Sequence, residues 1–343
     1  MIKIDRHGII LRPTKLKFEN KSVLNPGILQ EGNKVHIVYR AINEDLMSSL
    51  GYARLKGPLK LEERWDKPFM SPEYKYEKKG IEDPRITKIK DIYYMVHVVH
   101  DGKHALLAYS SGKDLFKMDR GGVISPRITY SRAGKIFRYS KLKDDYYFFE
   151  SFYKEYGGKN VFIWEKDGML FPEKIKGRYA MLHRILPDIQ IIYFKDFAEL
   201  QDNMLWMEYL MHLSEYVVME GKYGFEQRHV GGGAPPIRTK AGWLLIFHGT
   251  EESNKRRIYH GAAALLDLHN PTKVIARLPY PLISPKYKYE LQGLVDNVVF
   301  PTGTAIFNRR LYIYYGASDT YIAVASVGLK ELVKELLKHK EKK

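Results

Sequence analysis

The stretch Gly80-Ile81-Glu82-Asp83-Pro84-Arg85-Ile86-Thr87 is the most informative part of the chain, because its framework recurs. It combines a polar or turn pair with a proline, and it continues through a Lys90-Asp91 turn into an apolar segment. This is the pattern of strand, tight turn and strand. The same template begins at Asn25-Pro26-Gly27-Ile28, at Ala234-Pro235-Pro236-Ile237 and at Pro301-Thr302-Gly303. The sequence therefore predicts repeated β units.

A more divergent unit begins at Phe171-Pro172-Glu173-Lys174 and brings the number of units to five. Five such units predict an all-β fold, a five-bladed β-propeller that occupies residues 1–343 as a single domain. An acid at the start of a strand in one of these units, such as Asp83, lies at one end of the radial fold. Propellers keep their active sites at such an end.

Two segments show helical spacing. Leu200, Met204, Met207 and Met211 recur at that spacing, which predicts a helix inserted between the third and fourth units. Apolar residues with the same spacing predict an amphipathic C-terminal helix over about residues 328–341, with lysines opposite them. We expect this helix to pack on the propeller rather than on a membrane.

The composition limits the functional classes. Cysteine is absent, which excludes disulfides, thiolate metal sites and thiol nucleophiles, and no His, Asp or Glu grouping has metal-ligand spacing. The sequence shows neither a signal-peptide pattern nor about 18 consecutive uncharged apolar residues, so we expect a cytoplasmic protein without a membrane partner. The net charge of +16 comes from scattered basic residues, which favours an anionic small substrate over nucleic acid.

Three groups of motifs resemble glycoside hydrolase family 130, over essentially the whole chain. They are the stretch at 80–85, the glycine-rich run at 231–237 with Trp243 and His248-Gly249 behind it, and the run at 297–303 with Tyr314-Tyr315-Gly316-Ala317-Ser318-Asp319 behind it. The resemblance implies a five-bladed propeller that splits β-1,2- or β-1,4-linked manno-oligosaccharides with inorganic phosphate, giving α-mannose 1-phosphate with inversion. A minority of the family hydrolyses β-mannosides. Phosphate would be a co-substrate, and no cofactor is expected.

Breaking a glycosidic bond with inversion needs an acid for the leaving oxygen and a nucleophile on the opposite face. The resemblance implies that Asp83 is the acid, and that its proton passes through the 3-hydroxyl of the bound mannosyl unit. The alternative is that Asp83 is only a turn residue before Pro84. The neighbouring Glu82 is expected to face the other way on the strand and to be structural.

Phosphate binding needs charge-assisted donors. By the resemblance, these donors are Lys166, Arg184, His229, His248 and Tyr259. Lys166 stands where the family pattern has an arginine, and His229 stands where many members have a lysine. Lysine keeps the charge without the fork of arginine, whereas histidine is charged near neutral pH only if its pKa is raised.

The resemblance also implies that polar groups at the ends of the repeats bind the sugar, namely Asn25, Arg40, Ser49 and Asp319. A hydrolase of the same fold would need a carboxylate that activates water, about 6.5 to 9.5 Å from the acid. Glu226 and Glu290 are the candidates for that base. A third hypothesis is a propeller that binds carbohydrate without catalysis. The sequence leaves the linkage, the acceptor and a homo-oligomeric state open.

Overall fold

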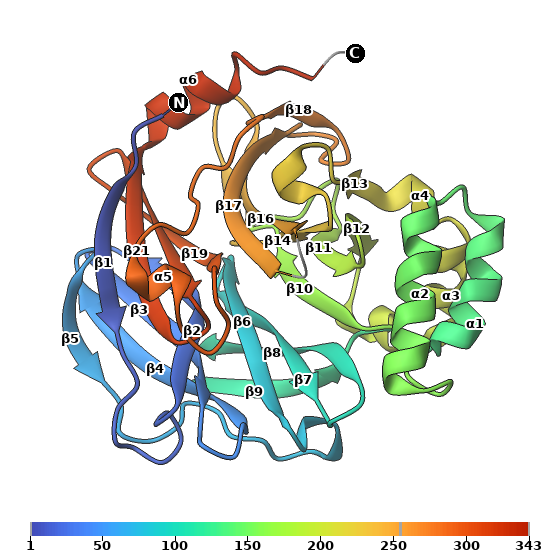
Figure 1. The fold of residues 1–343 in the computed structure, drawn as a ribbon, viewed down its shortest axis with the longest axis horizontal. Helices are drawn as coiled ribbons and strands as arrows, with labels where there is room; N and C mark the ends of the chain where they lie inside the picture. Colours follow the sequence, from blue (N-terminus) through green and yellow to red (C-terminus); the bar gives the residue numbers. More distant parts are fainter. Residues whose placement is uncertain (1, 254–255, 342–343) are drawn as a thin grey trace.

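The computed structural model describes residues 2–253 and 256–341, and antiparallel β-sheet is its main component (Figure 1). Two four-stranded units come first, each formed by strands that follow one another in the chain. A single parallel pair, Ser48 with Gly80, joins these two units into one sheet. Their strands are β2 (Ser22–Glu31), β3 (Lys34–Ile42), β4 (Ser48–Lys56), β5 (Lys60–Arg64), β6 (Gly80–Ile89), β7 (Ile92–His100), β8 (Ala105–Asp114) and β9 (Lys117–Val123).

Three further sheets account for the remaining strands of the described residues. The third unit contains β10 (Glu165–Leu170), β11 (Tyr179–Ile185), β12 (Ile189–Phe194) and β13 (Val217–Met219). The fourth contains β14 (His229–Gly232), β15 (Ile237–Arg238), β16 (Trp243–Ser253), β17 (Arg256–Leu266) and β18 (Val274–Arg277). The fifth contains β19 (Val299–Phe307), β20 (Arg310–Ala317) and β21 (Tyr321–Gly328), and the N-terminal strand β1 (Asp5–Leu11) pairs with β21 to complete it.

The first strand of each unit packs against a neighbouring unit. β2 contacts β6, β6 contacts β10, and β10 contacts β14, while β19 contacts both the fourth unit and β2. Glycine permits this approach at two points, because a Cβ on Gly27 would lie 2.7 Å from the carbonyl oxygen of Pro84, and one on Gly303 would lie 2.9 Å from that of Pro26. Apolar side chains fill the space between neighbouring sheets, as Val96 and Met181 do between the second and third units.

A bulge interrupts the first strand of three units at one register position. The residues before the bulge, Leu24, Glu82 and Lys166, pair with Arg40, Val98 and Arg184. The bulged residues themselves have positive φ, namely 48° at Asn25, 51° at Asp83 and 59° at Asp167. Asn and Asp tolerate this conformation better than other non-glycine residues, and such bulges re-aim side chains.

The predicted mostly-β fold is confirmed, but the predicted start of the third unit is wrong. The counterpart of Asp83 is Asp167 in β10, whereas Phe171-Pro172-Glu173-Lys174 lies in the connection from β10 to β11. The template's proline does not mark this unit, because the bulge of the third unit is built from Asp167 and Gly168 without a proline.

Helices gather beside the third unit, on the right of Figure 1. The predicted inserted helix is confirmed as α3 (Asn203–Met211), although its buried side chains are Trp206, Tyr209 and Leu210, and Met204 is exposed. The helical segment between the second and third units was not predicted. The other helices of this group are α1 (Tyr130–Ile136), η2 (Phe137–Tyr139), α2 (Asp144–Gly157), η3 (Phe197–Gln201) and α4 (Leu213–Tyr216).

The C-terminal helix α6 (Leu329–Leu336) packs on the fourth and fifth sheets through Leu332 and Leu336, as expected. It ends earlier than predicted, because the following residues pair with β18: the amide of Arg277 donates to the carbonyl of His339, and Lys340 bridges Ala276. Short helical turns elsewhere are η1 (Lys75–Glu77), η4 (Gly224–Glu226) and α5 (Lys288–Leu291).

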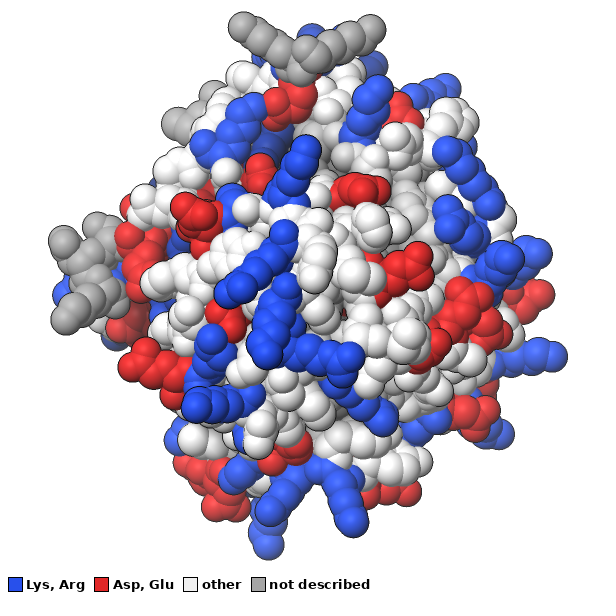
Figure 2. Space-filling view, turned by 90° about the vertical axis from the view of Figure 1, so that its right-hand side faces the viewer, with Lys and Arg blue, Asp and Glu red and all other residues white. Residues whose placement is uncertain are grey.

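The positive net charge is visible on the side of the molecule shown in Figure 2. Lysine and arginine side chains gather near the middle of this face, and acidic side chains lie around them. Among the described residues, no helix has the length and apolar character needed to cross a membrane.

Candidate active site

A cavity of about 270 Å³ lies where the bulges of the first three units meet residues of the fourth and fifth. We call it the central cavity; it is lined by Asn25, Arg40, Asp83, Lys166, Asp167, Arg184, Arg257, Tyr259, Val295, Val298, Phe300 and Asp319. A side cavity of about 180 Å³ shares Lys166, Arg184, Arg257 and Tyr259 with it. The side cavity is completed by Phe149, Tyr153, Trp164, Leu186, Arg228 and His229. Most of the predicted site residues therefore meet in two adjoining hollows.

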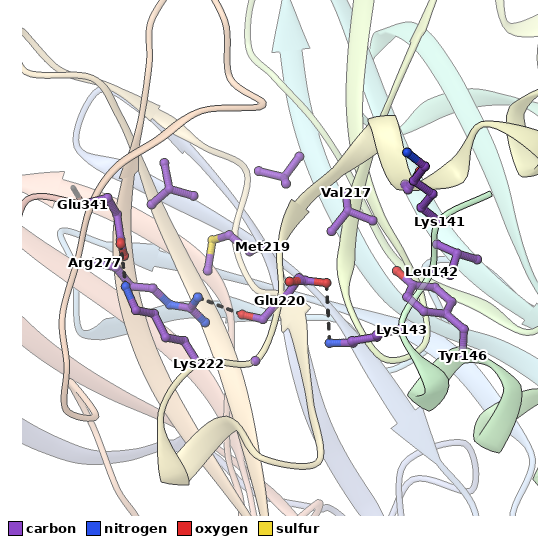
Figure 3. A pocket seen from close by; sticks show the side chains of 14 residues that line it. Lys141, Leu142, Lys143, Tyr146, Val217, Met219, Glu220, Lys222, Arg277 and Glu341 are labelled. Carbon is purple, nitrogen blue, oxygen red and sulfur yellow. Dashed lines mark hydrogen bonds and ion pairs between the residues drawn. The ribbon is translucent and has the colours of Figure 1, made fainter. Parts of the chain in front are cut away.

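A larger groove, of about 510 Å³, lies between α2, β13 and β18 and contains none of the predicted site residues (Figure 3). Several of its charged groups contact one another. Lys222 pairs with Glu341, Lys143 lies 3.9 Å from Glu220, and Arg277 donates to the backbone carbonyl of Glu220. Size alone therefore does not identify the functional site.

Asp83 occupies the bulge of β6 and is 6% exposed. Its Oδ1 accepts a hydrogen bond from Nδ2 of Asn25 at 2.8 Å and lies 3.7 Å from Nη1 of Arg40. Its backbone carbonyl accepts from the buried Arg85 at 2.7 Å. The acid is thus held rigidly at the wall of the central cavity, with one oxygen engaged by the protein.

The expectation that Glu82 faces away from Asp83 is wrong. Nη2 of Arg40 donates to Glu82 at 2.8 Å, and Nζ of Lys166 donates to it at 3.2 Å. The bulge breaks the alternation of side chains along β6, so that both carboxylates contact Arg40. Burial alone would raise the pKa of Glu82, but Arg40 and Lys166 outweigh burial and lower it to about 2. Glu82 is therefore an ionised partner of the basic residues near the site.

Lys166 and Arg184 face each other on neighbouring strands of the third unit. Nη1 of Arg184 lies 3.0 Å from Oδ2 of Asp167. Burial opposes the charge of Lys166, but Glu82 and Asp83 raise its pKa above the ordinary value. Both side chains line both cavities and carry positive charge, which is the arrangement that a bound anion requires.

The two predicted phosphate-binding histidines, His229 and His248, are neutral. Burial, reinforced by Arg184, holds the pKa of His229 and of His248 well below the usual range. Nε2 of His248 accepts from Nη1 of Arg184 at 3.1 Å, and His248 does not line either cavity. His229 lines the side cavity and contacts the hydroxyl of Thr250 at 3.0 Å. His248 therefore orients Arg184, and neither histidine supplies charge.

Three of the four predicted sugar-binding residues line the central cavity: Asn25, Arg40 and Asp319. Burial raises the pKa of Asp319 to about 6; Arg40 opposes this shift and the nearby Asp83 adds to it. Ser49 is buried and does not line the cavity, whereas its neighbour Ser48 accepts from Nε of Arg40 at 2.9 Å. Ser48, rather than Ser49, is the serine that supports the pocket.

The predicted hydrolase bases Glu226 and Glu290 do not face Asp83, since neither lines the central or the side cavity. Both are fully buried and cap a short helical turn, accepting bonds from two backbone amides each. Glu226 pairs with Arg277 at 2.8 Å, and Glu290 pairs with Arg6. Glu77 occupies the same kind of turn in the second unit. These glutamates are structural.

Sequence reasoning missed three charged residues of the site, namely Asp167, Arg228 and Arg257. Asp167 could have been found from the positions of Asn25 and Asp83 if the third unit had been aligned on its bulge. Arg257 could have been found from its spacing of two residues from Tyr259 on one strand, since such residues share a face.

Similarity to known proteins identifies the family of this chain. The sequence profile described as glycoside hydrolase 130, "beta-1,4-mannooligosaccharide phosphorylase", matches residues 8–338. The chain therefore belongs to glycoside hydrolase family 130, as the motifs suggested.

Two curated relatives align over nearly the whole chain. A 1,2-beta-oligomannan phosphorylase of Thermoanaerobacter is 33% identical over 97% of this chain and 99% of its own length. A beta-1,2-mannobiose phosphorylase of the same bacterium is 34% identical over 95% and 96%. Among solved structures, a beta-1,2-mannobiose phosphorylase of Listeria innocua superposes with a TM-score of 0.71 at 23% identity, over 98% of this chain and 99% of that one. The last comparison supports the fold.

Proposed function

We propose that this protein is an inverting β-mannoside phosphorylase. The observation that carries the proposal is the convergence of a buried carboxyl group, Asp83, with the cations Lys166 and Arg184 on the walls of one cavity. An inverting reaction needs the acid and the nucleophile on opposite sides of the anomeric carbon. A single acid beside an anion site meets this need when phosphate is the nucleophile.

In the proposed reaction, a phosphate oxygen forms a bond to the anomeric carbon while the glycosidic carbon–oxygen bond breaks. The leaving oxygen takes a proton that originates at Asp83, through the mannosyl 3-hydroxyl in the route implied by the family resemblance. The products are α-mannose 1-phosphate and the remaining sugar with a free hydroxyl. Phosphate arrives as an anion, so the protein needs no base.

We assign phosphate binding to Lys166, Arg184 and Tyr259, with His229 beside the anion and His248 behind Arg184. Asn25, Arg40 and Asp319 form the sugar side of the cavity. The arginine fork suits two phosphate oxygens, and the phenol of Tyr259 donates a neutral hydrogen bond. Inorganic phosphate is the co-substrate in this assignment.

The names of the relatives bear on the linkage. Two relatives that match nearly the whole chain are named for β-1,2-linked substrates, and a third, which matches 56% of the chain, is named for β-1,4-linked manno-oligosaccharides. β-1,2-Mannobiose is therefore the first substrate to test, with β-1,4-mannobiose second.

We also propose that the five β units are the blades of a propeller, with the candidate site at one end of its axis. The contacts between first strands support this arrangement, because they run from unit to unit and return from β19 to β2. The pairing of β1 with β21 would close the ring. A cytoplasmic location, where phosphate is available, completes the proposal.

The test is product analysis with and without phosphate. Phosphorolysis predicts α-mannose 1-phosphate from mannobiose in phosphate buffer and no cleavage in its absence. Equal release of free mannose under both conditions would instead establish a hydrolase. The carboxylates that line the central cavity beside Asp83 are Asp167, which Arg184 engages, and Asp319, so Asp319 would then be the residue to examine as the base. No cleavage of any mannoside would favour a binding protein.

A further inference from the structure

Beside Lys166 and Arg184, the fourth sheet carries a further group of charged residues, Arg228, Glu252 and Arg257, which we call the outer row. On β16 and β17, Thr250 pairs with Tyr259, and Glu252 pairs with Arg257. Residues two positions apart on a strand share a face, so Arg257 lies on the face that carries Tyr259. Arg257 lines both the central and the side cavity. Its side chain therefore borders the same space as Lys166 and Arg184.

Arg228 belongs to the same row and directly precedes β14 in the chain. Its guanidinium forms an ion pair with Glu252 and lies 5.5 Å from the ring centre of Phe149, a residue of α2 that lines the side cavity. The Arg228 side chain is 13% exposed, so its position is determined by packing as well as by charge.

The outer row has more positive than negative charge. Glu252 is the carboxylate that pairs with both Arg228 and Arg257, the latter at 3.6 Å, and one carboxylate neutralises one arginine. Burial and the charge of Arg257 both lower the pKa of Arg228. Two arginines held together at the rim of the side cavity, which Lys166 and Arg184 also line, add positive charge on the side of the site that contains no carboxylate in its described lining.

We propose that Arg228 and Arg257 form an outer anion clamp that binds the phosphate co-substrate together with Lys166 and Arg184. The clamp supplies the positive charge that neutral His229 does not provide. This inference rests on the proposed phosphorylase function and extends it to residues outside the predicted set. Arg257 lines both cavities and Arg228 lines the side cavity, so both side chains border the space that a clamp on the anion would need.

The experiment compares Arg257→Gln and Arg228→Gln with wild type and with the control Arg256→Gln. Arg256 is exposed, precedes Arg257 on the opposite face of β17, and lines neither cavity. Two quantities are measured on the full chain: the Kd for inorganic phosphate by calorimetry, and the KM values for phosphate and for β-1,2-mannobiose in the phosphorolytic assay. Thermal unfolding verifies that each variant is folded, and Arg228→Lys replaces Arg228→Gln if the latter does not fold.

The clamp predicts that the Kd and the KM for phosphate rise about tenfold or more in each glutamine variant, the usual effect of losing a hydrogen bond to a charged group. The KM for mannobiose and all values of Arg256→Gln should stay within about twofold of wild type. Arg257→Lys should fall between wild type and Arg257→Gln, because it keeps the charge but not the fork.

Phosphate Kd and KM values that remain within about twofold of wild type in both glutamine variants would overturn the clamp. The proposed function fails separately, if the wild type cleaves mannobiose without phosphate. In that case the calorimetric Kd still decides: weaker phosphate binding by the variants supports an anion clamp, and a wild type that does not bind phosphate refutes it.

Discussion

Asp83 and Asp167 occupy the same bulge in neighbouring units, with similar positive φ angles of 51° and 59°, yet their surroundings differ. Asp83 accepts a neutral hydrogen bond from Asn25, with Arg40 at 3.7 Å. Asp167 is 1% exposed and lies 3.0 Å from Arg184. The same bulge therefore places one carboxylate beside a neutral amide and another against a cation.

Arg85 connects the two aspartates. It is 1% exposed, donates to the backbone carbonyl of Asp83, and lies 3.5 Å from Oδ1 of Asp167. The repeat therefore sets the position of each aspartate, and the charged residues of neighbouring units determine which partners its carboxylate has. Arg85 thus contacts Asp83 through the main-chain carbonyl, whereas it contacts Asp167 through the carboxylate.

Asp83→Asn should have the largest effect on kcat. It tests whether Asp83, unlike Asp167, acts as an acid in the reaction. An amide keeps the hydrogen-bonding shape but cannot release a proton, so kcat should fall by about a thousandfold. Initial rates of mannose 1-phosphate formation measure this, with Asp91→Asn in an exposed turn as the control. A kcat within about tenfold of wild type would show that Asp83 is not the acid of the reaction.

Asp167→Asn should act mainly on stability and on the anion site. Removing this carboxylate leaves Arg184 and Arg85 without a buried counter-charge, so unfolding in urea should show a loss of about 3 kcal/mol. The KM for phosphate should rise in the same variant, because Arg184 loses the carboxylate that helps to orient its guanidinium. If instead Asp167→Asn abolishes turnover at full stability and unchanged KM, Asp167 takes part in the chemistry and the comparison above is wrong.

Asn25→Ala tests the neutral partner of Asp83. The loss of one hydrogen bond to a carboxylate should lower kcat/KM about tenfold, while the unfolding free energy changes less than in Asp167→Asn. Asn25→Asp, which places a carboxylate beside Asp83, should be worse than alanine because of like-charge repulsion. Kinetics at several pH values would reveal a shift of the alkaline limb, where a general acid loses its proton, in Asn25→Asp alone.

Asp319→Asn should give the smallest effect, on the pH dependence of stability. The pKa of Asp319 is raised to about 6 in the folded protein, so the native state binds its proton more tightly than the unfolded state. Wild type should therefore lose stability relative to Asp319→Asn as the pH rises from about 4 to about 6. Urea unfolding across this range measures the difference, and a constant difference would show that Asp319 does not titrate there.

Much of the β architecture could be predicted from the sequence, because turn residues and alternating segments depend on local chemistry. The third unit was misplaced, since its bulge at Asp167 lacks the proline of the template. Helix α2 was missed because aromatic residues cover most of its sides, so no clear period marks a buried face.

The site residues were predicted by resemblance, and the errors have physical causes. Glu226 and Glu290 are buried acids whose partners, Arg277 and Arg6, are remote in the sequence. The charge state of His229 depends on burial, which the sequence does not reveal. Arg228 and Arg257 meet only because two strands and α2 converge on one cavity. The phosphate-binding roles themselves stay predictions until the variants are measured.

The pairing of β1 with β21 also constrains how the protein is made. β1 has as its partner β21, a strand far along the chain, so β1 must wait, unpaired, until β21 has been synthesised. Such a contact raises the average sequence separation of native contacts, which slows folding. During that interval β1 is an unpaired strand, whose free backbone groups can pair with other nascent chains.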